Sequence, residues 1–177
     1  MNEYVNPRNF KFCPKCGNNL VKKFINQEQT ERLVCKNCNF IFYINPIPAV
    51  AVILMKNQQI VLVRRKYQPR KGKWSLPAGF MEYGETTEQT AIREAKEETN
   101  LKIRVKELFG VFPGFDDPRI HVVVIVYWGE IVNGQLKPGD DAAEVRFFPL
   151  TKLPEDIAFT AHRKILERLV SGGWVIR

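Results

Sequence analysis

Apolar residues in the middle of the chain form runs and alternations that predict a set of strands. Residues 49–55 are an unbroken apolar run, which is typical of a strand buried on both faces. Residues 56–59 form a polar turn, and residues 60–65 then alternate, so they are the expected partner strand. The same pattern predicts strands over 103–112, 120–131 and 144–148, with a loop over 113–119.

The run from 87 to 99 is predicted to be a helix. Thr86 followed by Gln89 is a capping-box pair, and the residues after it are rich in good helix formers without Gly or Pro. At 3.6 residues per turn, a set of small or apolar side chains shares one face and is expected to pack on the core. These are Ala91, Ile92, Ala95 and Thr99.

Two further local signals are found in the C-terminal half. Asn133-Gly134 predicts a type I′ hairpin between 131–132 and 135–136. A second amphipathic helix is predicted over 158–171 and should end at Gly172-Gly173. Its apolar side is expected to carry Ile165, Leu166, Leu169 and Val170. Strands and helices in this order are compatible with an α/β/α sandwich around a mixed sheet, an α+β or α/β fold class.

All four cysteines of the chain lie in two C-x-x-C pairs near its N-terminus. The pairs are Cys13/Cys16 and Cys35/Cys38, and their spacing suits tetrahedral coordination of one structural Zn²⁺. Disulfides are the alternative, but the chain shows no secretory signal, so we expect reduced thiols. Four thiolates would close the zinc site, which therefore has no open position for catalysis.

Residues between the cysteine pairs predict a zinc ribbon. Short strands over 20–24 and 31–34 flank a polar turn at 26–30, and metal binding would supply the folding free energy that so small a segment lacks. Two prolines in 43–48 force an extended connector, which we interpret as the boundary between a domain over 1–45 and a domain over 46–177. Basic and aromatic ribbon residues leave nucleic-acid binding as an alternative that we do not favour. They are Lys11, Lys15, Lys22, Lys23, Arg32 and Lys36, with Phe12 and Phe24.

Three carboxylates share one face of the helix over 87–99. Glu94, Glu97 and Glu98 lie within about one turn and repel one another, which favours a bound cation. Oxygen ligands without Cys or His indicate Mg²⁺ or Mn²⁺ rather than zinc. A solvated acidic helix face is the alternative interpretation.

The spacing around these glutamates resembles the Nudix box of the Nudix hydrolases. Gly79 is followed after five residues by Glu85, after seven more by Arg93-Glu94-Ala95, and after one more by Glu97-Glu98. Seven of the eight expected anchors match; Asn100 stands where the family has glycine, and Asn is the next-best residue for a left-handed helix cap. The resemblance covers roughly 46–177 and implies the Nudix sandwich fold.

The resemblance also implies roles for individual residues in the hydrolysis of a nucleoside diphosphate linked to a further group. The carboxylates of Glu94, Glu97 and Glu98 would bind Mg²⁺ together with the backbone carbonyl of Gly79. Glu85 and Arg93 look like the family's internal ion pair. The proton acceptor would be one of the three glutamates or Glu144, with Asp140 and Asp141 as rivals. Substrate contacts are expected from Arg65, Phe115 and Arg119.

The segments before and after the Nudix-like box indicate the class of substrate. A ribbon joined to a Nudix domain resembles the NADH pyrophosphatases, but their Ser-Gln-Pro and Trp-Pro-Phe-Pro signature is absent after Leu101. A similar layout and Pro118 favour ADP-ribose, FAD or a related ADP-containing compound as the small-molecule substrate. NADH hydrolysis, RNA binding or RNA-cap processing, and ligand sensing without catalysis remain alternatives.

Composition agrees with a metal-dependent enzyme acting on anions. The chain has 177 residues and a formal charge of +8, and a basic stretch over 64–73 precedes the acidic box, so the site is expected to attract phosphates. The N-terminus lacks a signal-peptide pattern and the apolar runs are too short to cross a bilayer, so we expect a cytoplasmic protein without membrane contact. A homodimer is expected from similar proteins.

Overall fold

The computed structural model describes residues 9–139 and 141–172. Its contacts divide the chain into two compact units, Met1–Pro46 with Asp117–His121, and Ile47–Asp116 with Val122–Arg177. Each unit is described separately below.

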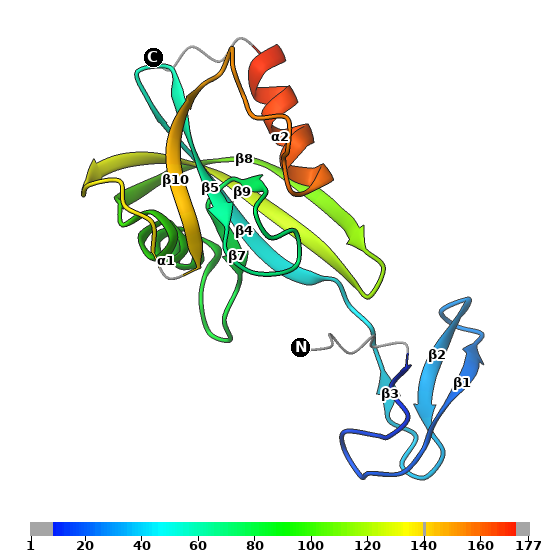
Figure 1. Ribbon diagram of the computed structural model, residues 1–177. Coiled ribbons are helices and arrows are strands. Elements are labelled where there is room, and N and C mark those ends of the chain that lie inside the picture. Colours follow the sequence, from blue (N-terminus) through cyan, green and yellow to red (C-terminus); the bar gives the residue numbers. More distant parts are fainter. Residues whose placement is uncertain (1–8, 140, 173–177) are drawn as a thin grey trace. The chain divides into compact units, whose positions relative to one another are not determined.

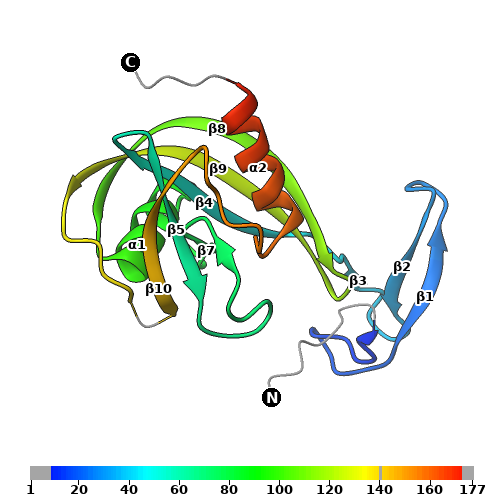
Figure 2. The same cartoon turned by 45° about the horizontal axis from the view of Figure 1, so that its top comes forward.

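The N-terminal unit is built on a three-stranded antiparallel sheet of β1 (Leu20–Ile25), β2 (Thr30–Cys35) and β3 (Ile41–Phe42) (Figure 2). The two predicted ribbon strands are present, and each is slightly longer than the sequence pattern suggested. The hydrophobic cluster of its described residues has four buried members, Cys13, Leu20, Leu33 and Cys35. So small an apolar core cannot by itself offset the entropy of ordering the segment, and two of its four members are thiols.

The second unit is organised around a seven-stranded mixed sheet (Figure 1). Its strands run in the order β10-β5-β4-β9-β8, while β6 pairs with β5 and β7 pairs with β4. Strands β4 and β9 are parallel, and β4 is antiparallel to β5 and β7. The strands are β4 (Ile47–Lys56), β5 (Gln59–Arg65), β6 (Trp74–Ser75), β7 (Ala78–Phe80), β8 (Lys102–Asp117), β9 (Ile120–Asn133) and β10 (Ala142–Pro149).

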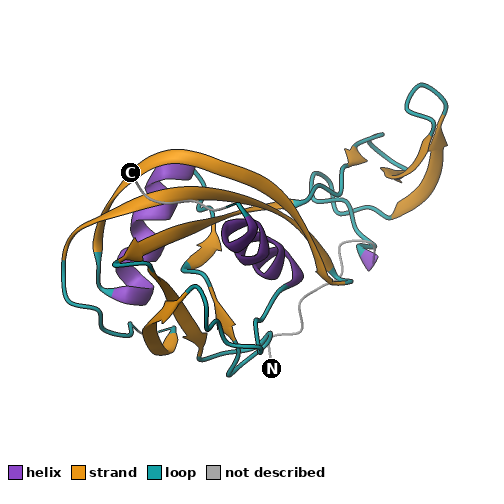
Figure 3. Cartoon of the chain, turned by 90° about the horizontal axis from the view of Figure 1, so that it is seen from above, coloured by secondary structure: helices purple, strands orange, loops and turns teal. Residues whose placement is uncertain are grey.

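Helices α1 (Thr87–Thr99) and α2 (Thr160–Ser171) cover opposite faces of this sheet (Figure 3). Successive residues of β4 point to opposite faces. Ala51 and Ile53 belong to the same buried cluster as the apolar residues of α2, whereas Val52 and Leu54 belong to the cluster that contains Ala95 of α1. The unit is therefore the α/β/α sandwich that the pattern of elements predicted.

Local signals place α1 where the sequence predicts it. The Thr86 hydroxyl accepts from the Gln89 amide and the Gln89 side chain accepts from the Thr86 amide, which completes the capping box. Asn100 caps the other end in the left-handed conformation with φ 60°. The buried face differs from the prediction by one position, because Thr90 is buried and Ile92 is exposed. Glu98 is therefore part of the buried face of the helix.

The loop predicted over 113–119 is wrong. Strand β8 continues through this segment to Asp117, and only Pro118 and Arg119 separate it from β9. Strand β8 lies at the edge of the sheet, where a proline such as Pro113 can be accommodated without its N–H. Proline and glycine content therefore misled the interpretation of this edge strand.

The type I′ hairpin predicted at Asn133-Gly134 is also wrong. Strand β9 ends at Asn133, and the chain over 134–139 lies outside any strand. Of the two residues only Gly134 has a positive φ, 105°, although type I′ requires it at both. A Cβ on Gly134 would lie 2.6 Å from the Asn100 carbonyl oxygen, so glycine is needed there to let the segment pass the end of α1.

Helix α2 begins two residues later than predicted. Phe159 is its N-cap residue and Gly172 its C-cap residue, while Gly173 lies outside the described residues. Ile165, Leu166 and Leu169 are buried as predicted, but Val170 is exposed. His162 takes a buried position instead, and its Nδ1 accepts a hydrogen bond from the Leu76 amide at 3.1 Å.

Candidate functional site

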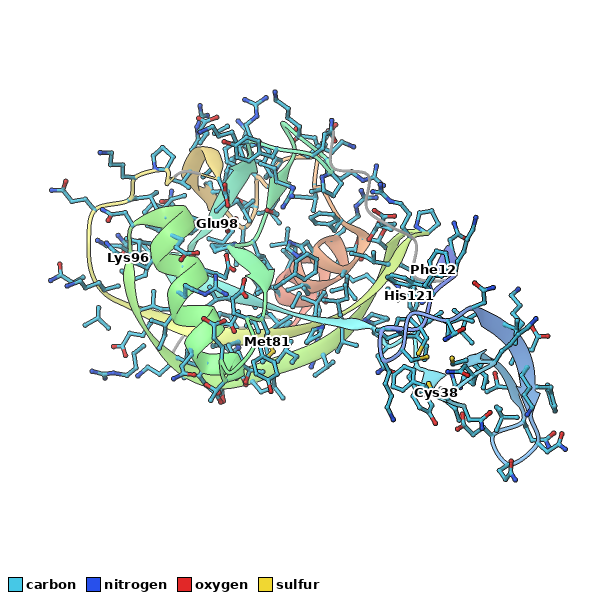
Figure 4. The ribbon with its side chains drawn as sticks, turned by 90° about the horizontal axis from the view of Figure 1, so that it is seen from below. Phe12, Cys38, Met81, Lys96, Glu98 and His121 are labelled. Atoms are coloured by element: carbon cyan, nitrogen blue, oxygen red, sulfur yellow. The ribbon has the colours of Figure 1, made fainter. Side chains whose placement is uncertain are left out.

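The four cysteines of the N-terminal unit form a compact thiol cluster (Figure 4). Their sulfur atoms all lie within 4.8 Å of one another, with Cys13 and Cys38 3.7 Å apart and Cys16 and Cys35 3.5 Å apart. Zn–S bonds of about 2.3 Å in a tetrahedron place sulfurs about 3.8 Å apart. Among the described residues, no other group of three or more Cys, His, Asp or Glu ligands is as compact. The cluster supports a structural zinc site.

Turn geometry aims backbone amides at these sulfurs. The Lys15 amide lies 3.4 Å from the Cys13 sulfur, and the Cys38 amide lies 3.5 Å from the Cys35 sulfur. Gly17 and Asn39, each directly after a cysteine pair, have φ values of 74° and 57°. Such N–H···S contacts stabilise thiolates, so the turns suit metal ligation.

In the second unit, Arg93 holds α1 against the segment that precedes it. Its guanidinium contacts Glu85 through two hydrogen bonds of 2.6 and 2.9 Å and donates to the Phe80 carbonyl at 3.0 Å. Glu85 also accepts from the Thr90 hydroxyl at 2.8 Å. The hydrogen bonds from Arg93 lower the pKa of Glu85 to about 2, so this carboxylate is ionised at neutral pH. The pair predicted between Glu85 and Arg93 is present, and it fixes α1 to the end of β7.

Glu98 is the buried carboxylate of the glutamate cluster (Figure 4). Burial raises its pKa to about 8, and the neighbouring Glu94 adds to this shift. One carboxylate oxygen accepts from the Ala78 amide at 2.9 Å. A buried acid with a raised pKa beside another acid is an arrangement that a cation would stabilise.

Glu94 and Gly79 meet so closely that Gly79 has no room for a side chain. A Cβ on Gly79 would lie 2.0 Å from one Glu94 carboxylate oxygen. Burial raises the pKa of Glu94, and its ion pair with Arg93 at 2.6 Å opposes that shift. The glycine therefore lets the Glu94 carboxylate lie directly against β7, next to the segment that contacts Glu98.

Glu97 lies on the solvent side of the same face. Its side chain is 58% exposed, and it contacts Arg93 at 3.1 Å. Arg93 thus bridges Glu94 and Glu97. Glu94 and Glu98 lie against β7, whereas the contact given above for Glu97 is with Arg93, and the three carboxylates are not gathered as closely as the four thiols are. The donors of the three glutamates are all carboxylate oxygens, which is the chemistry that Mg²⁺ and Mn²⁺ prefer.

The candidate proton acceptors from outside α1 differ in their surroundings. Glu144 forms ion pairs with Arg64 at 3.6 Å and with Arg146. Asp141 acts on Glu98 through its charge, and its carbonyl accepts from the Lys66 amide at 3.1 Å. Asp140 lies outside the described residues. The charge of Asp141 contributes to the raised pKa of Glu98.

The predicted substrate contacts come from different elements of the chain. Arg65 lies at the end of β5, its guanidinium is 5.1 Å from the Phe159 ring centroid, and its charge acts on Glu98. Phe115 is an exposed residue of β8, and Arg119 is paired with Asp117 in the turn after that strand. The contacts given above for the glutamates of α1 involve neither Phe115 nor Arg119.

Some contacts in the site involve groups that the sequence did not single out. The Ala78 amide and the Phe80 carbonyl are backbone groups, which leave no side-chain signal. Thr90 could have been found, because it lies three residues before Arg93 and therefore on the same helix face. Gly139 was not singled out either, although a Cβ there would lie 1.6 Å from the Glu97 carbonyl oxygen and the position therefore requires glycine.

These features define a Nudix domain preceded by a zinc ribbon, and family models agree. The NUDIX domain model matches residues 45–169, and a model described as Nudix N-terminal matches residues 11–44. The chain therefore belongs to the Nudix family. No described helix is both long and apolar enough to cross a membrane.

Three individual proteins show how similar the chain is to members of this family. The chain is 48% identical over 126 residues to an ADP-ribose pyrophosphatase of Methanocaldococcus jannaschii, covering 71% of this chain and 73% of the relative. It is 28% identical over 167 residues to the NAD-capped RNA hydrolase NudC of Vibrio atlanticus, covering 92% of this chain but 58% of that protein. A crystal structure of a NUDIX hydrolase from Nitrosomonas europaea matches with a TM-score of 0.81 and 34% identity, covering 93% of this chain and 92% of that one.

Proposed function

We propose that this chain is a divalent-metal-dependent pyrophosphohydrolase that cleaves the diphosphate of an ADP-containing nucleotide, with ADP-ribose as the favoured substrate and AMP as a product. The observation that carries the proposal is that the half-buried Glu94 and the buried Glu98 lie side by side against β7, at Gly79 and Ala78. An all-carboxylate site of this kind suits a hard cation and a phosphorylated substrate. The 48% identical ADP-ribose pyrophosphatase supports the choice of substrate.

Glu94, Glu97 and Glu98 would hold Mg²⁺ or Mn²⁺, with the Gly79 carbonyl as a further oxygen ligand. When bound, such an ion neutralises phosphoryl charge and lowers the pKa of a coordinated water. The four cysteines would hold Zn²⁺, which stabilises the ribbon and takes no part in hydrolysis. In our proposal the two domains span 1–45 and 46–177, and the active protein is a homodimer.

The remaining residues position these ligands and accept the proton. The bidentate pair of Arg93 with Glu85 orients the carboxylate face of α1 toward β7. Burial raises the pKa of Glu98 to about 8, so its carboxyl holds a proton at neutral pH until a bound cation favours the ionised form. Glu144 is the acceptor that we propose outside the box, where it pairs with Arg64 and Arg146, and Asp141, whose charge acts on Glu98, is its rival. Arg65 would contact the phosphates, and Phe115 and Arg119 would contact the base.

A second candidate is the hydrolysis of NADH or of NAD-capped RNA. The similarity to NudC across 92% of this chain favours it. The ribbon also exposes Phe12 and Phe24 among its lysines, and exposed aromatic rings beside cations suit single-stranded nucleic acid. The absent NADH signature argues for ADP-ribose.

A hydrolysis screen of the purified protein with Mg²⁺ tests both candidates. The substrates are ADP-ribose, FAD, NADH, NAD⁺ and a NAD-capped RNA, and the release of AMP or of the uncapped 5′-monophosphate RNA is the readout. We expect ADP-ribose or FAD to have a higher kcat/KM than NADH. A preference for NAD-capped RNA would replace the first candidate by the second, and no turnover of any substrate by metal-loaded protein would contradict both.

A further inference from the structure

A cavity of about 350 Å³ lies between the ends of β5 and β10 and the loop over 66–72. Four cationic side chains line it, together with the single carboxylate of Glu144. The cations are Arg64, Arg65, Lys66 and Lys71. Such an excess of positive charge in a concave site attracts an anion.

The two arginines of this cavity are held in place before any ligand arrives. The Arg64 Nε donates to the Gly72 carbonyl and the Arg65 Nε donates to the Pro69 carbonyl, each at 2.8 Å. The backbone of Arg65 closes the loop with two more hydrogen bonds, from its amide to the Lys73 carbonyl and from the Gly72 amide to its carbonyl. A site with ordered walls loses less entropy when it binds an anion.

Glu144 does not cancel this positive charge. Its carboxylate is shared between Arg64, at 3.6 Å, and Arg146, which does not line the cavity. Lys66 and Lys71 are both exposed and come from the loop, so their ammonium groups can adapt to an incoming anion.

The cavity adjoins the glutamate site but is separate from it. Arg65 lines the cavity, and its charge also acts on Glu98. The Lys66 amide donates to the Asp141 carbonyl at 3.1 Å, and the charge of Asp141 reaches Glu98 as well. A substrate whose scissile diphosphate lies at the glutamates could therefore extend into the cavity past Arg65.

We propose that this cavity is a second anion subsite, which binds a phosphate group that the substrate carries outside its scissile diphosphate. The inference rests on the proposed function for the position of the scissile bond. A volume of about 350 Å³ is near the lower end for ligand sites, about 300–1,000 Å³, so the cavity suits one phosphorylated unit rather than a whole dinucleotide. The phosphate could be a 2′-phosphate on a ribose or the first phosphodiester of a capped RNA.

The test compares the double variant Lys66→Ala/Lys71→Ala with wild type on matched substrate pairs. The pairs are ADP-ribose with and without a 2′-phosphate, and NAD⁺ with a NAD-capped trinucleotide. We expect kcat/KM for a phosphate-bearing substrate to fall at least about tenfold, since charge-assisted contacts are lost, while the unphosphorylated partner changes less than about twofold. The pair that responds identifies the source of the phosphate. Lys152→Ala, which removes an exposed lysine that does not line the cavity, should change neither.

A binding measurement without divalent metal separates this proposal from the proposed function. Calorimetry should show that wild type binds ADP-ribose 2′-phosphate or the capped trinucleotide at least about tenfold more tightly than its unphosphorylated partner, and that the double variant loses this difference. If hydrolysis is absent but this difference exists, the proposed function fails and the subsite stands. Equal binding of both members of each pair by wild type, or an equal loss of kcat/KM on all substrates, would overturn the subsite.

Discussion

Glu98 is ionisable and buried, and the metal-free protein should therefore lose stability as the pH rises. Burial raises its pKa from the ordinary value of 4.5 to about 8 in the folded chain. Below pH 4.5 both states hold the proton, whereas between these values only the unfolded chain releases it, so unfolding becomes easier as the pH increases. A bound cation would remove this penalty by stabilising the charged form.

We expect Glu98→Gln to raise the stability of Mg²⁺-free protein at pH 8, by on the order of 2 kcal/mol, and to abolish most hydrolysis. The amide oxygen can still accept from Ala78, so folding is retained. Thermal unfolding in Mg²⁺-free buffer between pH 5 and 8 measures the first effect, and AMP release measures the second.

Glu97→Gln is the matched control for this comparison. The exposed Glu97 carboxylate should leave stability unchanged while its loss still removes most activity. Near-wild-type turnover in both variants would remove the argument for a metal site on α1.

His162 should produce the opposite pH dependence. Burial, with a smaller contribution from the charge of Arg65, lowers its pKa from 6.5 to about 4. Between these values the unfolded chain binds a proton that the folded chain does not, so stability is lost as the pH falls from about 6.5 to about 4.

We expect His162→Gln to lower the melting temperature at pH 7 but to flatten its decline between pH 7 and 5. His121→Gln, which changes the other histidine of the chain, should leave the decline as in wild type. If the melting temperature of His162→Gln fell with pH as steeply as that of wild type, His162 would not be the cause of the decline.

At the scale of elements, the packing of β7 against α1 depends on Gly79. A Cβ there would overlap the Glu94 carboxylate, so Gly79→Ala must move a proposed metal ligand without disturbing the apolar core. We expect an about tenfold to hundredfold loss of kcat and a higher Mg²⁺ concentration for half-maximal activity, with the melting temperature changed by only a few degrees. A Mg²⁺ titration of activity measures this.

Gly110→Ala is a suitable comparison for Gly79→Ala, because the nearest atom to its added Cβ would be the end of the flexible Arg168 side chain at 3.0 Å. It should keep the Mg²⁺ dependence of wild type. If Gly79→Ala shares that dependence, Glu94 does not bind the metal.

The sequence predicted correctly those features that are fixed by residues close together in the chain. Helix α1 matches the prediction at both ends, because Thr86, Gln89 and Asn100 fix its caps within a few residues. The errors at Pro113 and at Gly134 have another origin. Whether Pro113 breaks a strand depends on that strand lying at the sheet edge, and Gly134 is required by the distant end of α1. The contact between Glu98 and the Ala78 amide could not be predicted from the sequence, because every residue type except proline offers the same backbone N–H.

For the molecule as a whole, the two units should differ in what stabilises them. The second unit has two large apolar clusters on the faces of its sheet, whereas the hydrophobic cluster in the described part of the ribbon unit has four buried members, and two of these are proposed zinc ligands. Structural zinc contributes about 10–16 kcal/mol in small zinc domains, so the ribbon should unfold without it. We expect the second unit to stay folded without zinc, because its described residues form no comparable thiol cluster.

We therefore expect a zinc chelator, applied to the full chain and followed by Mg²⁺, to expose the ribbon to protease while ADP-ribose hydrolysis stays within about threefold of the untreated rate. Cys35→Ser should behave like the chelated protein, because it removes one of the two buried thiols. Limited proteolysis read by mass spectrometry locates the cleavage, and cuts confined to 9–46 are the expected pattern. Unchanged protease resistance after measured zinc loss would show that the ribbon folds without metal. Loss of hydrolysis together with the cuts would mean instead that the ribbon takes part in the reaction.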